Sequence, residues 1–226
     1  PEDKSWPDTI PVLNSDSFCA VSRMFSTSFG LGISDDLKEW TGQYWINKNL
    51  DTPNPDSSIT NTAMHVFEDT AAYICRQVLV WASGDIKNAV SCYDYKTNSI
   101  THTEYLDTRA IFGIHFFNKQ NGWCVGDSGL IAKFTDGHWQ VLPSFTDKRL
   151  YQVFTVDSSA AWAVGDNGTL LKYDGINWEA QLLPTEQNLH SISFVDKTNG
   201  WIAGDSGLIY HYNGSNWVMD TTETTN

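Results

Sequence analysis

The chain has 226 residues, with 14 Lys and Arg against 27 Asp and Glu, so its formal net charge is −13. This charge argues against binding to nucleic acid or anionic lipid, because both are polyanions. No stretch is long and apolar enough to insert into a membrane, and residues 1–13 lack the pattern of a signal peptide. Abundant aromatic, glycine and short polar residues, with little helical periodicity, predict an all-β chain.

The first predicted unit covers residues 9–48. A strand over 12–21 is followed by the segment Ile33–Trp40, which repeats the order of strands and turns found later in the chain. At Tyr44-Trp45 a long connection begins, and it runs through 51–56 to the next inner strand. The prolines and asparagine of this connection are typical of a loop.

The second predicted unit covers residues 60–107. Residues 65–75 align with 115–125 at an offset of 50, which pairs Tyr73 with Trp123. Residues 92–105 supply the outer strands. The unit is longer than its successors because an insertion from Arg76 to Asn88 replaces a short turn.

Three clear copies of one sequence follow. Gly126, Gly165 and Gly204 each begin a Gly-Asp-x-Gly turn and are spaced by 39 and 39 residues. Each copy reads as four short strands joined by tight turns, because Gly supplies the positive φ that closes a hairpin. The copies span 108–147, 148–186 and 187–221.

Four antiparallel strands in about 39 residues form one blade of a β-propeller. The five units therefore predict a single all-β domain, a propeller of about five four-stranded blades. Because a blade cannot bury both faces alone, the ring must close or be completed by another chain. Closure by five blades and membership of a longer propeller both stay open, and the oligomeric state is not specified.

The repeated motif Gly-Trp-x-x-Gly-Asp-x-Gly, followed by Tyr-[Asp/Asn]-Gly-x-x-Trp, carries a family resemblance over residues 109–221. It resembles the bacterial propellers related to photosystem II stability and assembly factors and, more distantly, the Asp-box repeats of neuraminidases. Ser34 to Trp40 keeps only part of the Asp-box. The resemblance implies an extracytoplasmic scaffold that binds proteins or glycans, with any signal peptide already removed. It does not imply photosynthesis, because one fold serves many functions.

The repetition gives most of the notable residues a structural role. Asp127, Asp166 and Asp205 lie in hairpins that favour Asp for their own geometry, so turn formation is favoured over a metal site. Tryptophans at equivalent positions are expected to pack between adjacent blades: Trp40, Trp123, Trp139, Trp162, Trp178, Trp201 and Trp217.

His65 and His115 share a position on the innermost strand, where they either line a central channel or serve packing. Cys75 and Cys92 could meet on neighbouring strands as a disulfide, with buried free thiols as the alternative. No sequence feature indicates a cofactor, a metal or a catalytic group.

The two insertions carry the candidate binding site, because packing does not require them. By strand order both emerge on the same face, as the loops between second and third strands and between blades do. We expect this rim to display aromatic residues beside charged hydrogen-bonding groups, as in protein hot spots and sugar platforms. The predicted ligand-binding residues are Arg23, Trp45, Arg76, Trp81 and Asp85. The alternative is that Val78–Trp81 folds back as an extra strand or enters the core.

These features favour a non-catalytic scaffold that recognises a protein or glycan through one face of the propeller. A sialidase-like or other small glycoside hydrolase is the alternative enzyme, but it needs an arginine cluster and a Tyr nucleophile assisted by Glu. The chain has only Arg23, Arg76, Arg109 and Arg149, and no nucleophile elbow. A third alternative is a structural module of a larger exported or surface protein, with the Thr-rich tail 220–226 as a linker.

Overall fold

The computed structural model describes residues 21–26, 29–33, 37–40, 45–48, 57–67, 71–80 and 82–220. Side-chain environments are described for 59, 61–67, 71–80 and 82–220. Across these residues no helix is long and apolar enough to cross a membrane. The predicted strand over 12–20 and the connection over 51–56 lie outside the described residues.

The strands of this part of the chain form five four-stranded antiparallel sheets, each built from consecutive strands. The first sheet contains β1 (Val21–Ser26), β2 (Phe29–Ile33), β3 (Leu37–Trp40) and β4 (Trp45–Lys48). The second contains β5 (Ser57–Val66), β6 (Ala71–Val80), β7 (Asp85–Asp94) and β8 (Ser99–Asp107).

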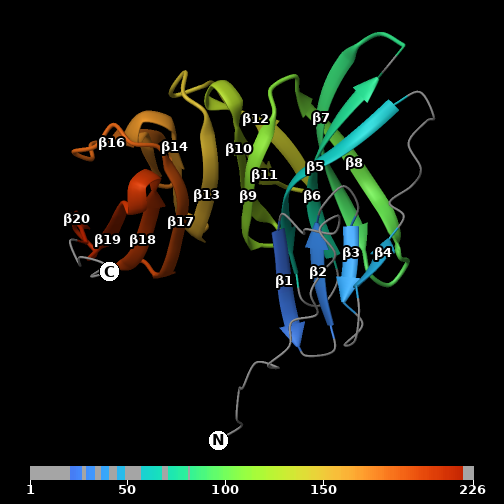
Figure 1. The fold of residues 1–226 in the computed structure, drawn as a ribbon, viewed down its shortest axis with the longest axis horizontal. Coiled ribbons are helices and arrows are strands. Elements are labelled where there is room, and N and C mark those ends of the chain that lie inside the picture. The colour runs from blue at the N-terminus through green and yellow to red at the C-terminus, as the bar shows by residue number, and fades with distance from the viewer. Residues whose placement is uncertain are drawn as a thin grey trace, which may run out of the picture.

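The last three sheets follow the 39-residue repeat. The third contains β9 (Ile111–Asn118), β10 (Asn121–Gly126), β11 (Ile131–Thr135) and β12 (His138–Val141). The fourth contains β13 (Leu150–Asp157), β14 (Ala160–Gly165), β15 (Leu170–Tyr173) and β16 (Trp178–Gln181). The fifth contains β17 (Leu189–Asp196), β18 (Asn199–Gly204), β19 (Ile209–Tyr212) and β20 (Trp217–Met219). The predicted four-stranded antiparallel sheets are confirmed, and Figure 1 shows them in chain order.

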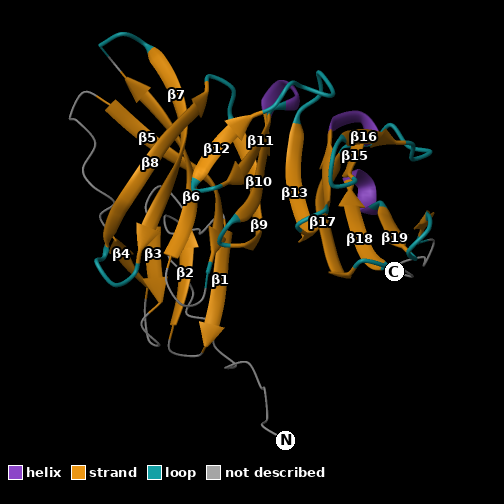
Figure 2. Ribbon diagram, turned by 180° about the vertical axis from the view of Figure 1, so that it is seen from behind, coloured by secondary structure: helices purple, strands orange, loops and turns teal. Residues whose placement is uncertain are grey.

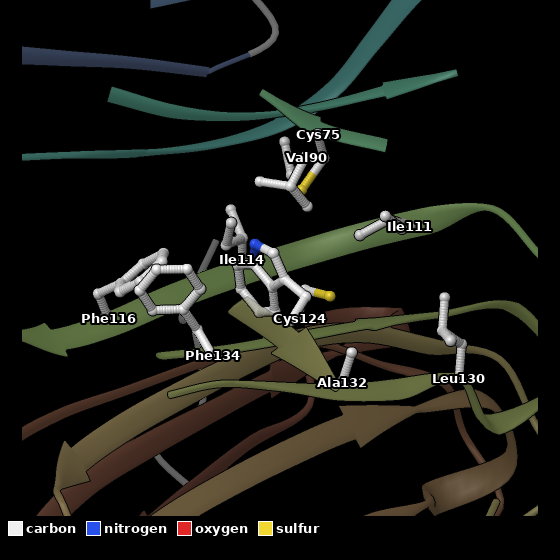
Figure 3. Packing of buried hydrophobic residues seen from close by; sticks show 11 residues of the cluster. Cys75, Val90, Ile111, Ile114, Phe116, Cys124, Leu130, Ala132 and Phe134 are labelled. Carbon is white, nitrogen blue, oxygen red and sulfur yellow. The ribbon is translucent and has the colours of Figure 1, made fainter. Parts of the chain in front are cut away.

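The hydrophobic core lies between neighbouring sheets. Figure 3 shows Cys75 and Val90 of the second sheet facing Ile114 and Cys124 of the third. The tryptophans at the repeated position of β10 and β14 are buried as predicted, with Trp123 3% and Trp162 4% exposed. Each contacts an aromatic pair on the next sheet, so that the Trp123 ring lies 4.7 Å from Tyr173 and 5.0 Å from Trp178. Such edge-to-face contacts add to the free energy gained by burial.

The Gly-Asp-x-Gly turns require their first glycine because two backbone segments approach closely. The Asp127 amide donates to the Ala110 carbonyl at 2.8 Å, and the Leu130 amide donates to the Asp127 carbonyl at 3.0 Å. A Cβ on Gly126 would lie 1.9 Å from the Ala110 oxygen. The turn itself needs the left-handed region, with Ser128 at φ 48° and Gly129 at φ 67°. Each later copy repeats this geometry.

In the second sheet the strands continue where the other sheets turn. Arg76 takes the place that Gly126 holds at the offset of 50, and it pairs with Asn61 and Ala89. Beyond it, β6 and β7 stay paired as far as Val80 and Asp85. The insertion is therefore an extended hairpin flanked by β5, in which Val78–Val80 continues strand β6 and forms no additional strand of the sheet. The hairpin rises past the neighbouring turns (Figure 1).

One predicted boundary in the first sheet is wrong. Trp45 begins strand β4 rather than a connection, and it pairs with Trp40 of β3. Aromatic and β-branched residues such as Trp45 and Ile46 suit a pleated strand. Strand β4 ends at Lys48, and residues 49–56, which hold the rest of the predicted connection, lie outside the described residues.

Candidate functional site

The turns between second and third strands lie at one end of the sheets, together with the extended hairpin. Figure 2 shows the three short 3-10 turns, Asp127–Gly129, Asp166–Gly168 and Asp205–Gly207, at this end. The innermost strands also begin here. We call this surface the upper rim, defined by the three turns, residues 77–80 and 82–88 of the hairpin and the starts of β9, β13 and β17.

A row of polar contacts crosses the last three sheets along the upper rim. Arg149 Nε donates to Asp127 Oδ1 at 3.2 Å, and the Tyr151 hydroxyl donates to Asp166 Oδ1 at 2.6 Å. His190 Nε2 lies 2.6 Å from Asp205 Oδ1. The three repeated aspartates thus bind side chains of the inner strands or their entry segments, while their own carbonyls close the turns.

An aromatic row runs beside these contacts. Phe112, Tyr151 and His190 are the second residues of their inner strands and are spaced by 39 and 39 residues. The Tyr151 ring lies 6.4 Å from Phe112 and 5.0 Å from His190. The Arg149 guanidinium lies 5.0 Å from the centre of the Phe112 ring, within cation–π distance. The rim therefore presents rings and charges in alternation.

The contacts shift the titration of these groups. Its hydrogen bond to Asp127 raises the pKa of Arg149, and donation to Asp166 raises the pKa of Tyr151. The hydrogen bond with His190 lowers the pKa of Asp205. Each pKa shift favours the protonation state that keeps the contact. The row therefore consists of three charge-assisted hydrogen bonds, which the ring contacts of Tyr151 bring side by side.

Arg109 joins the base of the hairpin to this row. Its Nη2 lies 2.7 Å from Asp107 Oδ2, at the end of β8, and its Nη1 donates to Ser144 Oγ at 2.8 Å. Nη1 also donates to the Ser128 carbonyl in the turn of the third sheet, at 3.3 Å. At the hairpin base, Asn88 Nδ2 donates to the Thr108 carbonyl at 2.9 Å. Hairpin and turns are consequently parts of one surface.

The structure separates the five predicted binding residues. Asp85 is exposed at the start of β7, in the hairpin of the upper rim. The prediction that Arg76 is exposed on the rim is wrong, because Arg76 lies within strand β6 and is only 8% exposed. Its Nη1 donates to Ser91 Oγ at 3.4 Å. Arg23 lies in β1 and pairs with Leu31 of β2. Trp45 lies in β4, and Trp81 lies outside the described residues.

Arg149, Tyr151 and His190 were not predicted as site residues. The fixed spacing of 112, 151 and 190 was available in the sequence, but three different residue types occupy this position. A search for identical residues therefore passes over it. When the residue type changes at one position of a repeat whose glycines and tryptophans stay the same, that position is a candidate for binding at the surface.

His65 and His115 contribute to packing between blades. The Phe116 amide donates to His65 Nδ1 at 3.3 Å, and the Thr155 amide donates to His115 Nδ1 at 3.1 Å. The His115 ring also stacks on Phe154, with centroids 4.3 Å apart. Each imidazole thus links its own inner strand to the next one.

Cys75 and Cys92 are free thiols, so the disulfide considered above is absent. Cys92 pairs with Tyr73, and Cys75 pairs with Val90, so the register does not place the two cysteines opposite each other. Burial raises the pKa of the Cys75 and Cys124 thiols.

Comparison with solved structures identifies the architecture. A YCF48 structure with a bound D1 peptide has a TM-score of 0.54 at 11% identity, covering 90% of this chain and 81% of its own. The WD40 propeller domain of Doa1 has a TM-score of 0.65 at 9% identity, covering 88% of this chain and 66% of its own. The fold is a β-propeller.

YCF48 from Cyanidioschyzon merolae also matches, with a TM-score of 0.56 at 13% identity, covering 85% of this chain and 68% of its own. The predicted likeness to propellers of the photosystem II assembly type is confirmed at the level of structure. No family model matches the sequence. No curated protein matches it either.

Proposed function

We propose that this propeller is a binding scaffold that recognises an extended segment of a partner protein on its upper rim. The observation that carries this proposal is the connected row of Arg149, Tyr151 and His190 with the three turn aspartates. Rings beside charged groups are frequent in the hot spots of protein interfaces. The row spans three sheets, a length that suits an extended peptide better than a single small molecule.

The charge of the chain supports a partner segment with basic side chains. The net charge of −13 attracts cationic partners and speeds their association. On the rim, Asp127 and Asp205 have side chains that are 40% and 43% exposed, so each keeps oxygen surface for a further donor. A Lys or Arg of the peptide can share these carboxylates with Arg149 and His190.

The β6–β7 hairpin borders one end of the row of polar and aromatic contacts on the upper rim. Asp85, Ile86 and Lys87 are exposed on β7 beyond the point where β8 ends, since Asn88 pairs with Asp107. Unpaired strand edges of this kind accept an added strand. The YCF48 structure named above contains a bound D1 peptide, which supports peptide recognition by a propeller of this type. A location outside the cytoplasm stays a proposal that rests on the family resemblance.

The test is a selection from a displayed library of random peptides, run beside a glycan array with the same full chain. We expect peptides enriched in Lys or Arg to be selected. Binding of the best peptide should weaken about tenfold or more in Arg149→Ala and Tyr151→Phe, because tenfold corresponds to about 1.4 kcal/mol, within the range of a hot-spot contact.

Ile176→Ala is the matched control, because Ile176 is 81% exposed in the turn between β15 and β16, at the other end of the sheet. Its affinity should equal that of the unchanged chain. Binding to glycans alone, or equal losses in the control and the rim variants, contradicts the proposal.

A further inference from the structure

Two apolar residues on one face of the last sheet, Trp201 and Ile209, are exposed, although the equivalent positions are buried in the third and fourth sheets. Trp201 is 39% exposed, whereas Trp123 and Trp162 are 3% and 4% exposed. Ile209 is 41% exposed, whereas the equivalent Ile131 is fully buried. These residues face the next sheet in the third and fourth units, so the fifth unit ends in an uncovered copy of an inter-blade interface.

This face is also less polar than its internal counterparts. The residue opposite Trp123 is Lys133 and the residue opposite Trp162 is Lys172, whereas Trp201 pairs with His211. One strand further out, Gln140 and Glu179 are replaced by Val218, which is 52% exposed. Trp201, Ile209 and Val218 thus form an exposed apolar patch, which is typical of a surface that is covered by another protein.

The interfaces between the third, fourth and fifth sheets show which residues contact the tryptophan at this position. Trp123 contacts the pair Tyr173 and Trp178, and Trp162 contacts the pair Tyr212 and Trp217 at 5.3 and 5.5 Å. The members of each pair lie opposite each other on the third and fourth strands of the following sheet. An aromatic cross-strand pair at this register position is therefore the partner of the exposed tryptophan.

The first sheet carries such a pair with no preceding sheet in the described part of the chain. Trp40 of β3 and Trp45 of β4 are register partners, and Trp40 pairs with Gly30 of β2 as Phe134 pairs with Gly122 and Tyr212 pairs with Gly200. Register thus assigns Trp40 and Trp45 to the position of the covering pair. Figures 1 and 2 show the first and last sheets apart from each other, so within one chain this pair does not cover Trp201.

We propose that the face formed by Trp201, Ile209, His211 and Val218 docks the Trp40–Trp45 sheet of a second copy of the chain, head to tail. The contact is heterologous, since each copy contributes a different surface, and it generates a closed ring or a longer assembly. It continues the series of inter-blade interfaces from one chain into the next.

Sedimentation and mixing test this arrangement. The unchanged chain should self-associate, and Trp201→Asp should weaken association about thirtyfold or more, which is about 2 kcal/mol. Trp45→Asp should do the same. A mixture of the two variants should form heterodimers, because each variant keeps one intact face. A chain that is monomeric at all concentrations, or variants that fail to combine although both are folded by circular dichroism, overturns the proposal.

A photo-cross-linking side chain at position 209 keeps the test decisive if Trp45→Asp does not fold. Isotope-labelled and unlabelled full chains are mixed and irradiated, and the cross-linked peptides are identified by mass spectrometry. We expect cross-links between different copies, from position 209 to residues 37–48. Cross-links to 37–48 within one copy show closure of a single ring, and cross-links from 209 to 209 show a symmetric dimer. Either result contradicts the head-to-tail contact.

Discussion

At the scale of single residues, the turns depend on close backbone contacts more than on side-chain chemistry. Gly126 has extended backbone, so it is needed because of space and not because of φ. Gly137 is the opposite case, with φ 85° and nothing within 4 Å of an added Cβ. Substitution of Gly126 therefore tests the effect of a steric clash, and substitution of Gly137 tests the effect of backbone strain.

Gly126→Ala should lower the free energy of unfolding by about 3 kcal/mol, because its Cβ meets the backbone oxygen of Ala110 and one segment must move. Gly137→Ala should cost only about 1 kcal/mol, the strain of a left-handed alanine. Denaturant unfolding of both variants measures the difference. Equal losses would show that the Ala110 contact is not the constraint.

An ion pair between the fourth and fifth sheets gives a pH dependence. Lys197 pairs with Asp157, and this contact, together with donation from Ser159, lowers the pKa of Asp157 to about 2. A lowered pKa contributes stability that is complete above pH about 5 and is lost as the pH falls through about 2, below which Asp157 is protonated in both the folded and the unfolded state.

Lys197→Gln should therefore reduce the unfolding free energy at pH 7 by about 1 kcal/mol, since the Lys197 side chain is 71% exposed and water screens the pair. The difference from the unchanged chain should shrink steadily as the pH is lowered towards 3. Thermal unfolding over this pH range checks it. A difference that stays constant with pH assigns the loss to packing of the Lys197 stem instead.

At the scale of elements, the repeat made the last three sheets predictable. Gly-Asp-x-Gly and Asp-Gly or Asn-Gly fixed the turns, and β10, β11 and β12 and their later copies lie where these turns require. The hairpin was harder, because Val78-Leu79-Val80 suits a strand as well as a buried loop. At Arg76 the missing glycine was the physical sign that the strand continues. The contact row of the upper rim could not be predicted, since it joins residues about 15 to 22 positions apart through sheet geometry.

The position of the hairpin depends on Asn88, whose side chain is 1% exposed. Asn88→Ala removes the bond to the Thr108 carbonyl and leaves that oxygen without this donor, so we expect a loss of about 1–2 kcal/mol in unfolding free energy. Denaturant unfolding measures it. Thr101→Ala is the control, because its hydroxyl contact to the Cys92 carbonyl is long, at 3.4 Å, and exposed. A loss no greater than in the control would mean that the hairpin base is held by strand pairing alone.

At the scale of the whole molecule, different positions of the repeat serve folding and the proposed recognition. Repeated tryptophans and glycines build the interfaces between sheets, while positions that vary within the same framework reach the upper rim. The composition anticipated the all-β class, and the 39-residue period anticipated the four-stranded sheets. Composition and period carry no information on the partner, because the scaffold is the same whatever it binds.

The most direct test of recognition on the upper rim is hydrogen–deuterium exchange of the full chain with and without a selected peptide. We predict slower exchange on binding in 77–80, 82–88, 127–129, 149–151, 166–168 and 188–190. The turns at the other end of the sheets, 118–121, 157–160 and 196–199, should exchange at unchanged rates. Protection confined to those turns, or to the face around Trp201, would contradict it.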